Sequence, residues 1–221
     1  MPATGMQALP NQLAAGLPTG TVHLDTEVVG IDGDGVRTPD GHVAADHVVV
    51  ATDAPAAAAL LAAHVAPPRP GRSTTTLWYG ADAPPRRGPH LMLDGDRSGP
   101  ANTVVVMSEV APTYAPRGRA TVAVSLRHPA VDIDRADRAA RSQLAAWFDI
   151  ATSDLDLLRI DDIPYAQPRC DVDDLVSLRH PVGVAPGRWV CGDHRDTASI
   201  QGAMSSGLRA GRAILAAEGG A

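Results

Sequence analysis

The feature that most constrains this chain is a short apolar strand, closed by Gly192 and Asp193 and followed by a helix of small residues. The strand reads GRWVCGD, and the predicted helix covers residues 200–217. Such a junction brings a carboxylate to the free backbone N–H groups of a helix N-terminus, which suits a polyol and the polar edge of a ring. Small side chains near the helix start let a flat ligand approach the backbone, where the helix dipole favours negative charge. They are Gly202, Ala203, Ser206 and Gly207.

Hydrophobic periodicity along the rest of the chain predicts alternating helices and short strands, which is a mixed α/β composition. A continuous valine run, HVVVAT, is typical of a buried strand, and DGDG before it is typical of a hairpin turn. The predicted elements, in chain order, are a helix over residues 6–17, a hairpin or meander from residue 21, the HVVVAT strand, a helix over residues 55–64, four β-type runs between residues 73 and 128, an amphipathic helix over residues 134–150 with Asp134 near its start, and a strand ending in IPYAQP.

A proline-rich joint over residues 66–70 (APPRP) predicts a crossing between two domains. The β-type runs beyond it favour a mostly antiparallel sheet. We therefore expect one α/β domain formed by residues 1–70 and 185–221. A second, α+β domain is expected over residues 71–184.

Composition excludes several classes of function. The formal net charge is −6, with acidic and basic residues interspersed, so we expect no nucleic-acid partner. All 19 basic residues are arginine, which excludes lysine-dependent chemistry within these residues. The eight histidines have no HxH or HxxxH spacing, and we expect no metal site.

The two cysteines, Cys170 and Cys191, lack a CxxC spacing, and the start of the chain has no basic region followed by an apolar core. We therefore expect a cytoplasmic setting, with both cysteines as small buried hydrophobes. The most apolar stretch, residues 51–66, is interrupted by polar residues and proline. It is too short to cross a bilayer, and no membrane span is expected.

The run over residues 191–214 resembles the C-terminal flavin-binding segment of the superfamily of FAD-dependent amine oxidases, phytoene desaturases and protoporphyrinogen oxidases. In those enzymes Gly-Asp ends the last strand, and a Ser-Ile-x-Gly-Ala-x-x-Ser-Gly helix start follows a short loop. The matching residues are Gly192, Asp193, Ser199, Ile200, Gly202, Ala203, Ser206 and Gly207. The resemblance implies that Asp193 hydrogen-bonds the ribityl chain of FAD, while the backbone over residues 199–203 faces the pyrimidine edge. It also implies that the helix N-terminus stabilises the anionic reduced flavin.

Further segments agree with this resemblance. The start TGMQALPNQLA, with the strand TEVVGI, is similar to the family's Gly-Gly-Met helix and the strand after it. The backbone of Val28 or Val29 would then contact the adenine. Residues 46–55 resemble the strand that returns to the dinucleotide fold, and residues 163–168 resemble the segment before the last flavin strand. The resemblance implies a two-domain, Rossmann-like flavoprotein that transfers hydride from a C–H bond of an apolar small-molecule substrate to flavin N5.

The strand, GxGxxG turn and helix that bind the ADP moiety in the family are absent from this sequence. The nearest string, at residues 33–38, lacks the third glycine and is read as a hairpin turn. Met1 lies beside Thr4-Gly5-Met6, where the family has Gly-Gly-Met, and this suggests a split gene, a truncated reading frame or an isolated C-terminal half. The alternative is a non-catalytic fragment or binding subunit that needs a complementary ADP-binding chain or forms a homo-oligomer. No catalytic residue is assigned, and the absence of lysine favours desaturase-like or dehydrogenase-like members.

Several residues keep two interpretations at this point. Asp193 either contacts flavin or caps the turn after the strand. His194 and Arg195 either approach a phosphate or the substrate, or face solvent in a loop. The aromatic residues either line a pocket for an apolar substrate or belong to the core; they are Trp78, Tyr79, Trp147 and Tyr165.

Overall fold

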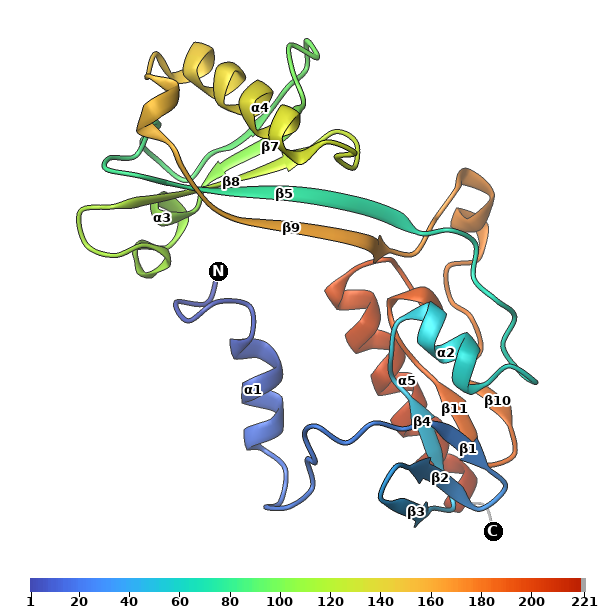
Figure 1. Ribbon diagram of the computed structural model, residues 1–221. Coiled ribbons are helices and arrows are strands. Elements are labelled where there is room, and N and C mark those ends of the chain that lie inside the picture. The colour runs from blue at the N-terminus through green and yellow to red at the C-terminus, as the bar shows by residue number, and fades with distance from the viewer. Residues whose placement is uncertain (220–221) are drawn as a thin grey trace. The chain divides into compact units, whose positions relative to one another are not determined.

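The computed structural model describes residues 1–219, and its internal contacts divide the chain into two compact units. Unit 1 contains residues 1–22 and 73–164, and unit 2 contains residues 23–72 and those from residue 165 onward. Figure 1 shows the chain leaving and re-entering unit 2 through two long strands. The strands are β5 (Arg72–Ala81) and β9 (Asp156–Gln167).

Unit 1 is built on a five-stranded sheet in the order β6-β7-β8-β5-β9. Its other strands are β6 (Leu91–Leu93), β7 (Ala101–Val106) and β8 (Ala120–Leu126). The pairs β6–β7, β7–β8 and β8–β5 are antiparallel, as the sequence predicts. Every second residue of β8 is buried, because successive side chains of a strand point to opposite faces.

Helix α4 (Ile133–Phe148) lies over one face of this sheet (Figure 1). Ala140 and Leu144 on the helix are buried in one cluster with Val104 and Val122 of the sheet. The helix begins where the Asp132 side chain accepts a hydrogen bond from the Arg135 N–H at 2.9 Å. The N-cap is therefore Asp132, whose backbone is extended, and Asp134 lies in the first turn, near the start of the helix as predicted.

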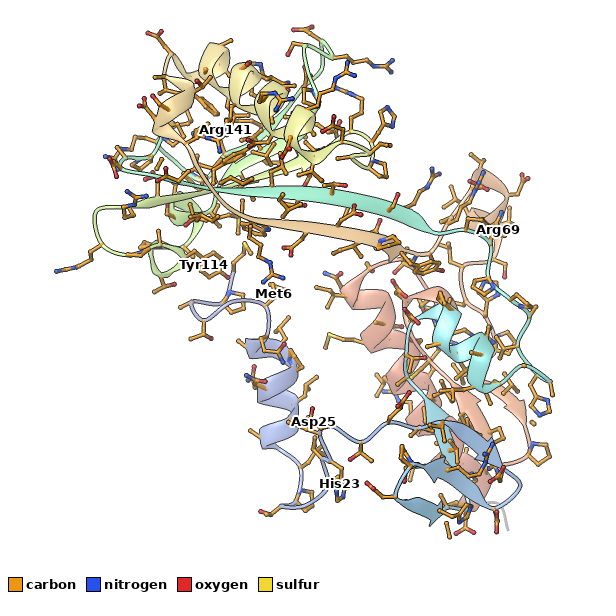
Figure 2. All side chains as sticks on the ribbon, in the orientation of Figure 1. Met6, His23, Asp25, Arg69, Tyr114 and Arg141 are labelled. Atoms are coloured by element: carbon orange, nitrogen blue, oxygen red, sulfur yellow. The ribbon has the colours of Figure 1, made fainter. Side chains whose placement is uncertain are left out.

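The N-terminal segment belongs to unit 1, although the sequence placed it with the α/β domain. Helix α1 (Ala8–Ala15) ends at Gly16, as predicted, but none of its residues is buried. Tyr114 donates its hydroxyl proton to the Pro2 carbonyl at 2.7 Å, and Thr113 donates to the Ala3 carbonyl. Figure 2 shows Tyr114 beside this segment. These backbone contacts attach the first residues to unit 1, a connection that hydrophobic periodicity cannot reveal.

A small antiparallel meander opens unit 2, in the order β1-β2-β3. Its strands are β1 (Gly30–Asp32), β2 (Gly35–Thr38) and β3 (Gly41–Ala44). Asp32 pairs with Gly35 across the turn, so the hairpin predicted from DGDG is confirmed. The strand expected from residue 21 is wrong in its extent, since regular pairing begins only at Gly30.

A second small sheet of unit 2 has the order β10-β11-β4. Its strands are β10 (Gly183–Ala185), β11 (Arg188–Val190) and β4 (Val48–Val50). Strands β4 and β11 are parallel, and Val48 pairs with Arg188. Helix α2 (Ala54–Leu60) packs on one face through Ala57, in the cluster that holds Val190. Helix α5 (Ile200–Glu218) packs through Ala210 against a separate cluster that holds Cys191 and Trp189.

Residues 165–184 also belong to unit 2, where the sequence assigned them to the second domain. Arg69 forms ion pairs with Asp171 and Asp174, and the Val190 N–H donates to the Val182 carbonyl at 2.8 Å. Because residues 165–184 contact unit 2 in both of its chain segments, the second domain ends at residue 164 and not at residue 184 as the sequence predicts. The remaining short helices are α3 (Met107–Val110), η1 (Pro112–Tyr114), η2 (Thr152–Asp154), η3 (Val172–Val176) and η4 (Asp193–Arg195). Within the described residues, no helix has the length and hydropathy that a membrane crossing requires.

Candidate functional site

The parallel strands β4 and β11 end side by side in unit 2, and each leads into a helix. The Cys191 N–H donates to the Val50 carbonyl at 2.9 Å, which continues the pairing one step beyond β11. After β4, the Asp53 side chain caps α2 by accepting the Ala56 N–H at 2.9 Å. After β11, Gly192 and Asp193 lead through η4 to α5. In open parallel sheets, ligands bind at this carboxyl edge of the strands.

Gly192 is fixed by the neighbouring helix. Its N–H donates to the Ser206 hydroxyl oxygen at 2.9 Å, and that hydroxyl lies 2.8 Å from the Gly192 carbonyl oxygen. Gly192 has φ +148, and a Cβ there would lie 2.6 Å from the His194 ring and 3.0 Å from the Thr52 carbonyl. Only glycine fits this position, and the turn presents the next residue, Asp193, at the edge of the sheet.

The start of α5 is held by its own loop. The Ser199 hydroxyl accepts the Gly202 N–H at 3.0 Å, and the Ser199 carbonyl accepts the Ala203 N–H at 3.0 Å. These two N–H groups are therefore already paired, and within the described residues only those of Ile200 and Gln201 remain for a ligand. A Cβ on Gly202 would lie 1.9 Å from the Thr197 carbonyl oxygen. The missing side chain at Gly202 thus makes room for the chain's own loop. The sequence had suggested that it makes room for a flat ligand.

Three ionisable side chains meet at this edge. Burial raises the pKa of the Tyr165 phenol, and the carboxylates of Asp193 and Asp53 raise it further. The Asp193 side chain, 28% exposed, has no hydrogen-bond partner in the part of the chain that the structure describes, and the His194 Nδ1 lies 3.9 Å from it. Its oxygens are therefore available to hydroxyl donors of a ligand.

His194 does not face solvent, and Arg195 is partly exposed although its Nε is buried. The His194 side chain is only 7% exposed, and neither of its ring nitrogens has a hydrogen-bond partner among residues 1–219. Burial lowers the pKa of His194, with Arg195 and His180 acting in the same direction against Asp193 and Asp53. The imidazole is therefore neutral at pH 7, with one donor and one acceptor.

Val28 and Val29 are not brought to this edge. Both are exposed and precede β1, and the Val29 N–H donates to the Arg37 carbonyl at 2.9 Å. They therefore lie beside the β1-β2-β3 meander, whereas Asp193 follows β11 of the other small sheet. Their contact with adenine stays a prediction.

The sequence matches the family described as flavin containing amine oxidoreductase over residues 1–215. The chain belongs to this family. No curated protein sequence matches it. For this amine oxidoreductase family member, the site above is the segment that the sequence predicts to contact flavin.

Solved structures of similar fold include an oxidoreductase from Methanosarcina mazei, with a TM-score of 0.63 and 16% identity over 83% of this chain and 48% of that chain. A putrescine oxidase variant redesigned in its cofactor binding gives a TM-score of 0.66 and 15% identity over 97% of this chain and 53% of that chain. Reduced UDP-galactopyranose mutase gives a TM-score of 0.56 and 12% identity over 76% and 41%. The family member described here therefore spans about half the length of these relatives.

Sequence reasoning missed the roles of two side chains in this family member. Asp53 caps α2, and Ser206 holds the turn before Asp193. Ser206 was counted only as a small side chain, yet it is fully buried and holds Gly192. A serine on the buried face of an amphipathic helix is the signal that could have indicated this role. Of the aromatic residues, Tyr79 belongs to the core, and Tyr165 lines a pocket together with His194 and Arg195. That these residues bind an apolar substrate stays a prediction.

Proposed function

We propose that this chain is the C-terminal, flavin-contacting part of an FAD-dependent oxidoreductase that acts on an apolar small molecule. The carrying observation is the Asp193 carboxylate, which lies without a hydrogen-bond partner among the described residues at the carboxyl edge of β4 and β11. Family membership supports FAD as the cofactor. When bound, FAD supplies the acceptor for a hydride from a substrate C–H bond.

The residues at this edge fit part of such a cofactor. Asp193 offers acceptor oxygens for the hydroxyls of a ribityl chain, and the amides of Ile200 and Gln201 offer donors at the N-terminus of α5. Gly192 fits this role because a side chain there would collide with His194 and would displace the turn. The chain's own contribution is to hold and orient, since no acid–base pair is assigned.

Cofactor binding is tested by adding FAD to the purified chain, alone and together with a co-expressed chain that carries GxGxxG, removing unbound FAD by gel filtration, and recording the flavin absorption band. The variants are compared in whichever of the two preparations retains FAD. We expect Asp193→Ala to weaken FAD binding roughly tenfold to hundredfold, the range for a hydrogen bond to a charged group. Asp40→Ala, in the turn between β2 and β3, is the control and should leave binding unchanged. Equal retention by the Asp193 variant contradicts the role of Asp193.

A second proposal concerns what completes the flavin site. Strand β4 lies at the edge of its sheet with no strand on its outer side within the described residues, although Val48 and Val50 are buried. The outer edge of such a strand presents unpaired N–H and C=O groups that can pair with a further strand. One face of α5 carries exposed apolar side chains at helical spacing. They are Ile200, Met204, Leu208 and Leu215, and space beside Gly207 and Gly211 is open.

We infer that this edge and this face bind the segment that supplies the ADP-binding strand-turn-helix unit, from the same polypeptide or from a separate chain. The relatives support this, because the matching part of this chain covers 48% and 53% of their lengths. Co-expression with a chain that carries GxGxxG tests the idea. We expect co-purification and FAD retention, and Met204→Glu should abolish both, whereas Leu158→Glu on unit 1 should not. Retention of FAD by the chain alone, with no effect of Met204→Glu, contradicts it.

A further inference from the structure

A pocket of about 320 Å³ lies within unit 2, next to the carboxyl edge of β4 and β11. Its wall includes Ala54 at the start of α2, Tyr165 near the end of β9, and His194 and Arg195 of η4. Arg69, labelled in Figure 2, also lines it. We call this space the His194 pocket. Asp53 and Asp193 do not line it.

The wall of the His194 pocket holds buried polar atoms that have no hydrogen-bond partner among the described residues. Both ring nitrogens of His194 and the Nε of Arg195 are buried without a hydrogen-bond partner in the described chain. Leaving such a group unpaired destabilises the fold, so buried polar groups almost always have a partner. A single ligand in the pocket would pair His194 and Arg195 together.

The lining of the pocket carries three arginines, Arg69, Arg169 and Arg195, and one carboxylate, Asp174. The carboxylates of Asp53 and Asp193 lie near His194 but outside the lining. Arg69 pairs with Asp171 and Asp174, and Arg169 pairs with Asp171 at 2.7 Å. Arg195 has no carboxylate within ion-pair distance among residues 1–219, and its side chain donates only to the Pro181 carbonyl. Burial and the neighbouring Arg209 lower the pKa of Arg195, which is the direction that uncompensated positive charge produces.

We infer that the His194 pocket binds an oxyanion, a phosphate or carboxylate group of a small molecule, between the His194 ring and the Arg195 guanidinium. The neutral imidazole supplies an N–H donor without adding charge, and Arg195 supplies the charge and a second donor. Tyr165 lines the same pocket, and its phenol is a further hydrogen-bond donor. This site does not depend on whether Asp193 contacts flavin.

The test is thermal unfolding of the purified chain at increasing inorganic phosphate, with ionic strength held constant by chloride. We expect a saturable rise of the unfolding midpoint in the wild type. His194→Phe keeps a ring without nitrogens, and Arg195→Gln removes the charge. Both should need at least about tenfold more phosphate for the same rise. Acetate in place of phosphate shows whether the pocket prefers a phosphate or a carboxylate.

Arg179→Gln is the matched control, because Arg179 is 77% exposed and does not line the pocket. An equal rise in all four proteins, or no rise with either anion, overturns the inference. If a variant does not fold, nitrogen NMR of the wild-type histidines decides. The His194 ring signals should move on addition of anion while those of His128 in unit 1 stay, and any other pattern overturns the proposal. Loss of FAD binding in Asp193→Ala with phosphate binding intact would separate the two sites.

Discussion

The hydroxyl of Ser206 contacts both backbone polar groups of Gly192, at 2.9 Å from its nitrogen and 2.8 Å from its oxygen. Ser206 lies on α5, and Gly192 follows β11, so this one side chain joins the helix to the turn that presents Asp193. The hydroxyl is fully buried. The position of the Asp193 carboxylate therefore depends on a residue that need not touch any ligand.

Ser206→Ala should lower the free energy of unfolding by about 1–3 kcal/mol, because it leaves the Gly192 N–H buried without an acceptor. Denaturant titration measures this change. Ser205→Ala is the control, since the Ser205 hydroxyl makes one long bond of 3.3 Å to Asp196 and should cost much less. An equal effect of the two substitutions contradicts the bridging role.

Alanine at the glycines of α5 should give opposite results. Gly202→Ala places a Cβ 1.9 Å from the Thr197 carbonyl and should destabilise the protein by about 1–3 kcal/mol, the cost of overpacking. Gly207 has no atom within 4 Å of its Cβ position, and Gly207→Ala should stabilise the protein by about 0.5–1 kcal/mol. Denaturation midpoints decide. Destabilisation by Gly207→Ala would show that another surface already covers this side of α5.

The lowered pKa of His194 gives a pH dependence of stability. The unfolded chain takes up the proton near pH 6.5, the usual value for histidine, while the folded chain does so only at lower pH. Stability from this group is therefore complete above about pH 6.5 and falls as the pH drops from there to the folded pKa. His194→Phe should remove that part of the slope. NMR titration should place the His194 midpoint below about 6.5, and a higher midpoint contradicts burial of a neutral ring.

The two cysteines should differ in reactivity. Cys191 is buried, and burial raises the pKa of its thiol, whereas Cys170 is partly exposed. The expectation that both are buried is therefore wrong for Cys170. A thiol reagent should modify Cys170 at least about tenfold faster than Cys191 in the native protein. Cys170→Ser should remove the fast phase, and a fast phase that persists would mean that Cys191 is accessible.

Asp94 connects the loops of unit 1 to α4 and should stabilise the unit against acid. Burial acts to raise the pKa of Asp94, but hydrogen bonds from Ser98 and Gly99 and the charge of Arg127 outweigh it and lower the pKa. Stability from this group is complete above about pH 3.9, its unfolded value, and is lost as the pH falls through the folded pKa. Asp94→Asn should therefore lower the free energy of unfolding at pH 7 and make it decline less steeply below pH 4. Acid unfolding followed by circular dichroism measures both. An acid transition equal to that of the wild type contradicts the stabilising role of Asp94.

Local signals predicted the elements of this fold better than their assembly. The alternation in residues 120–126 became a strand with one buried face. The valines before Thr52 became β4, in which Val48 and Val50 are buried but Val49 is exposed, so the expectation of a strand buried on both faces is wrong for one face. The attachment of residues 1–22 depends on the carbonyls of Pro2 and Ala3, whose partners are more than a hundred residues away. Backbone contacts at such separation leave no periodicity in the sequence.

The candidate site was predictable where a motif implies a turn and obscure where side chains from separate segments meet. Gly192, Asp193 and the Ser199 cap follow from the strand-turn-helix junction. The burial of His194 does not follow, because a polar loop residue is ordinarily exposed, and here it is covered by elements from other parts of unit 2.

The parallel pairing of β4 with β11 has a consequence for synthesis. Val50 leaves the ribosome early, but its partner strand begins at Arg188, and all of residues 73–164 must emerge first. Unit 1 can therefore fold while residues 23–72 of unit 2 are already outside the ribosome and the valines of β4 still lack their partner strand. Such long-range pairing is slow to form. We expect lower temperature during synthesis to raise the yield of native chain, because cooling weakens the apolar association of these valines with those of another copy.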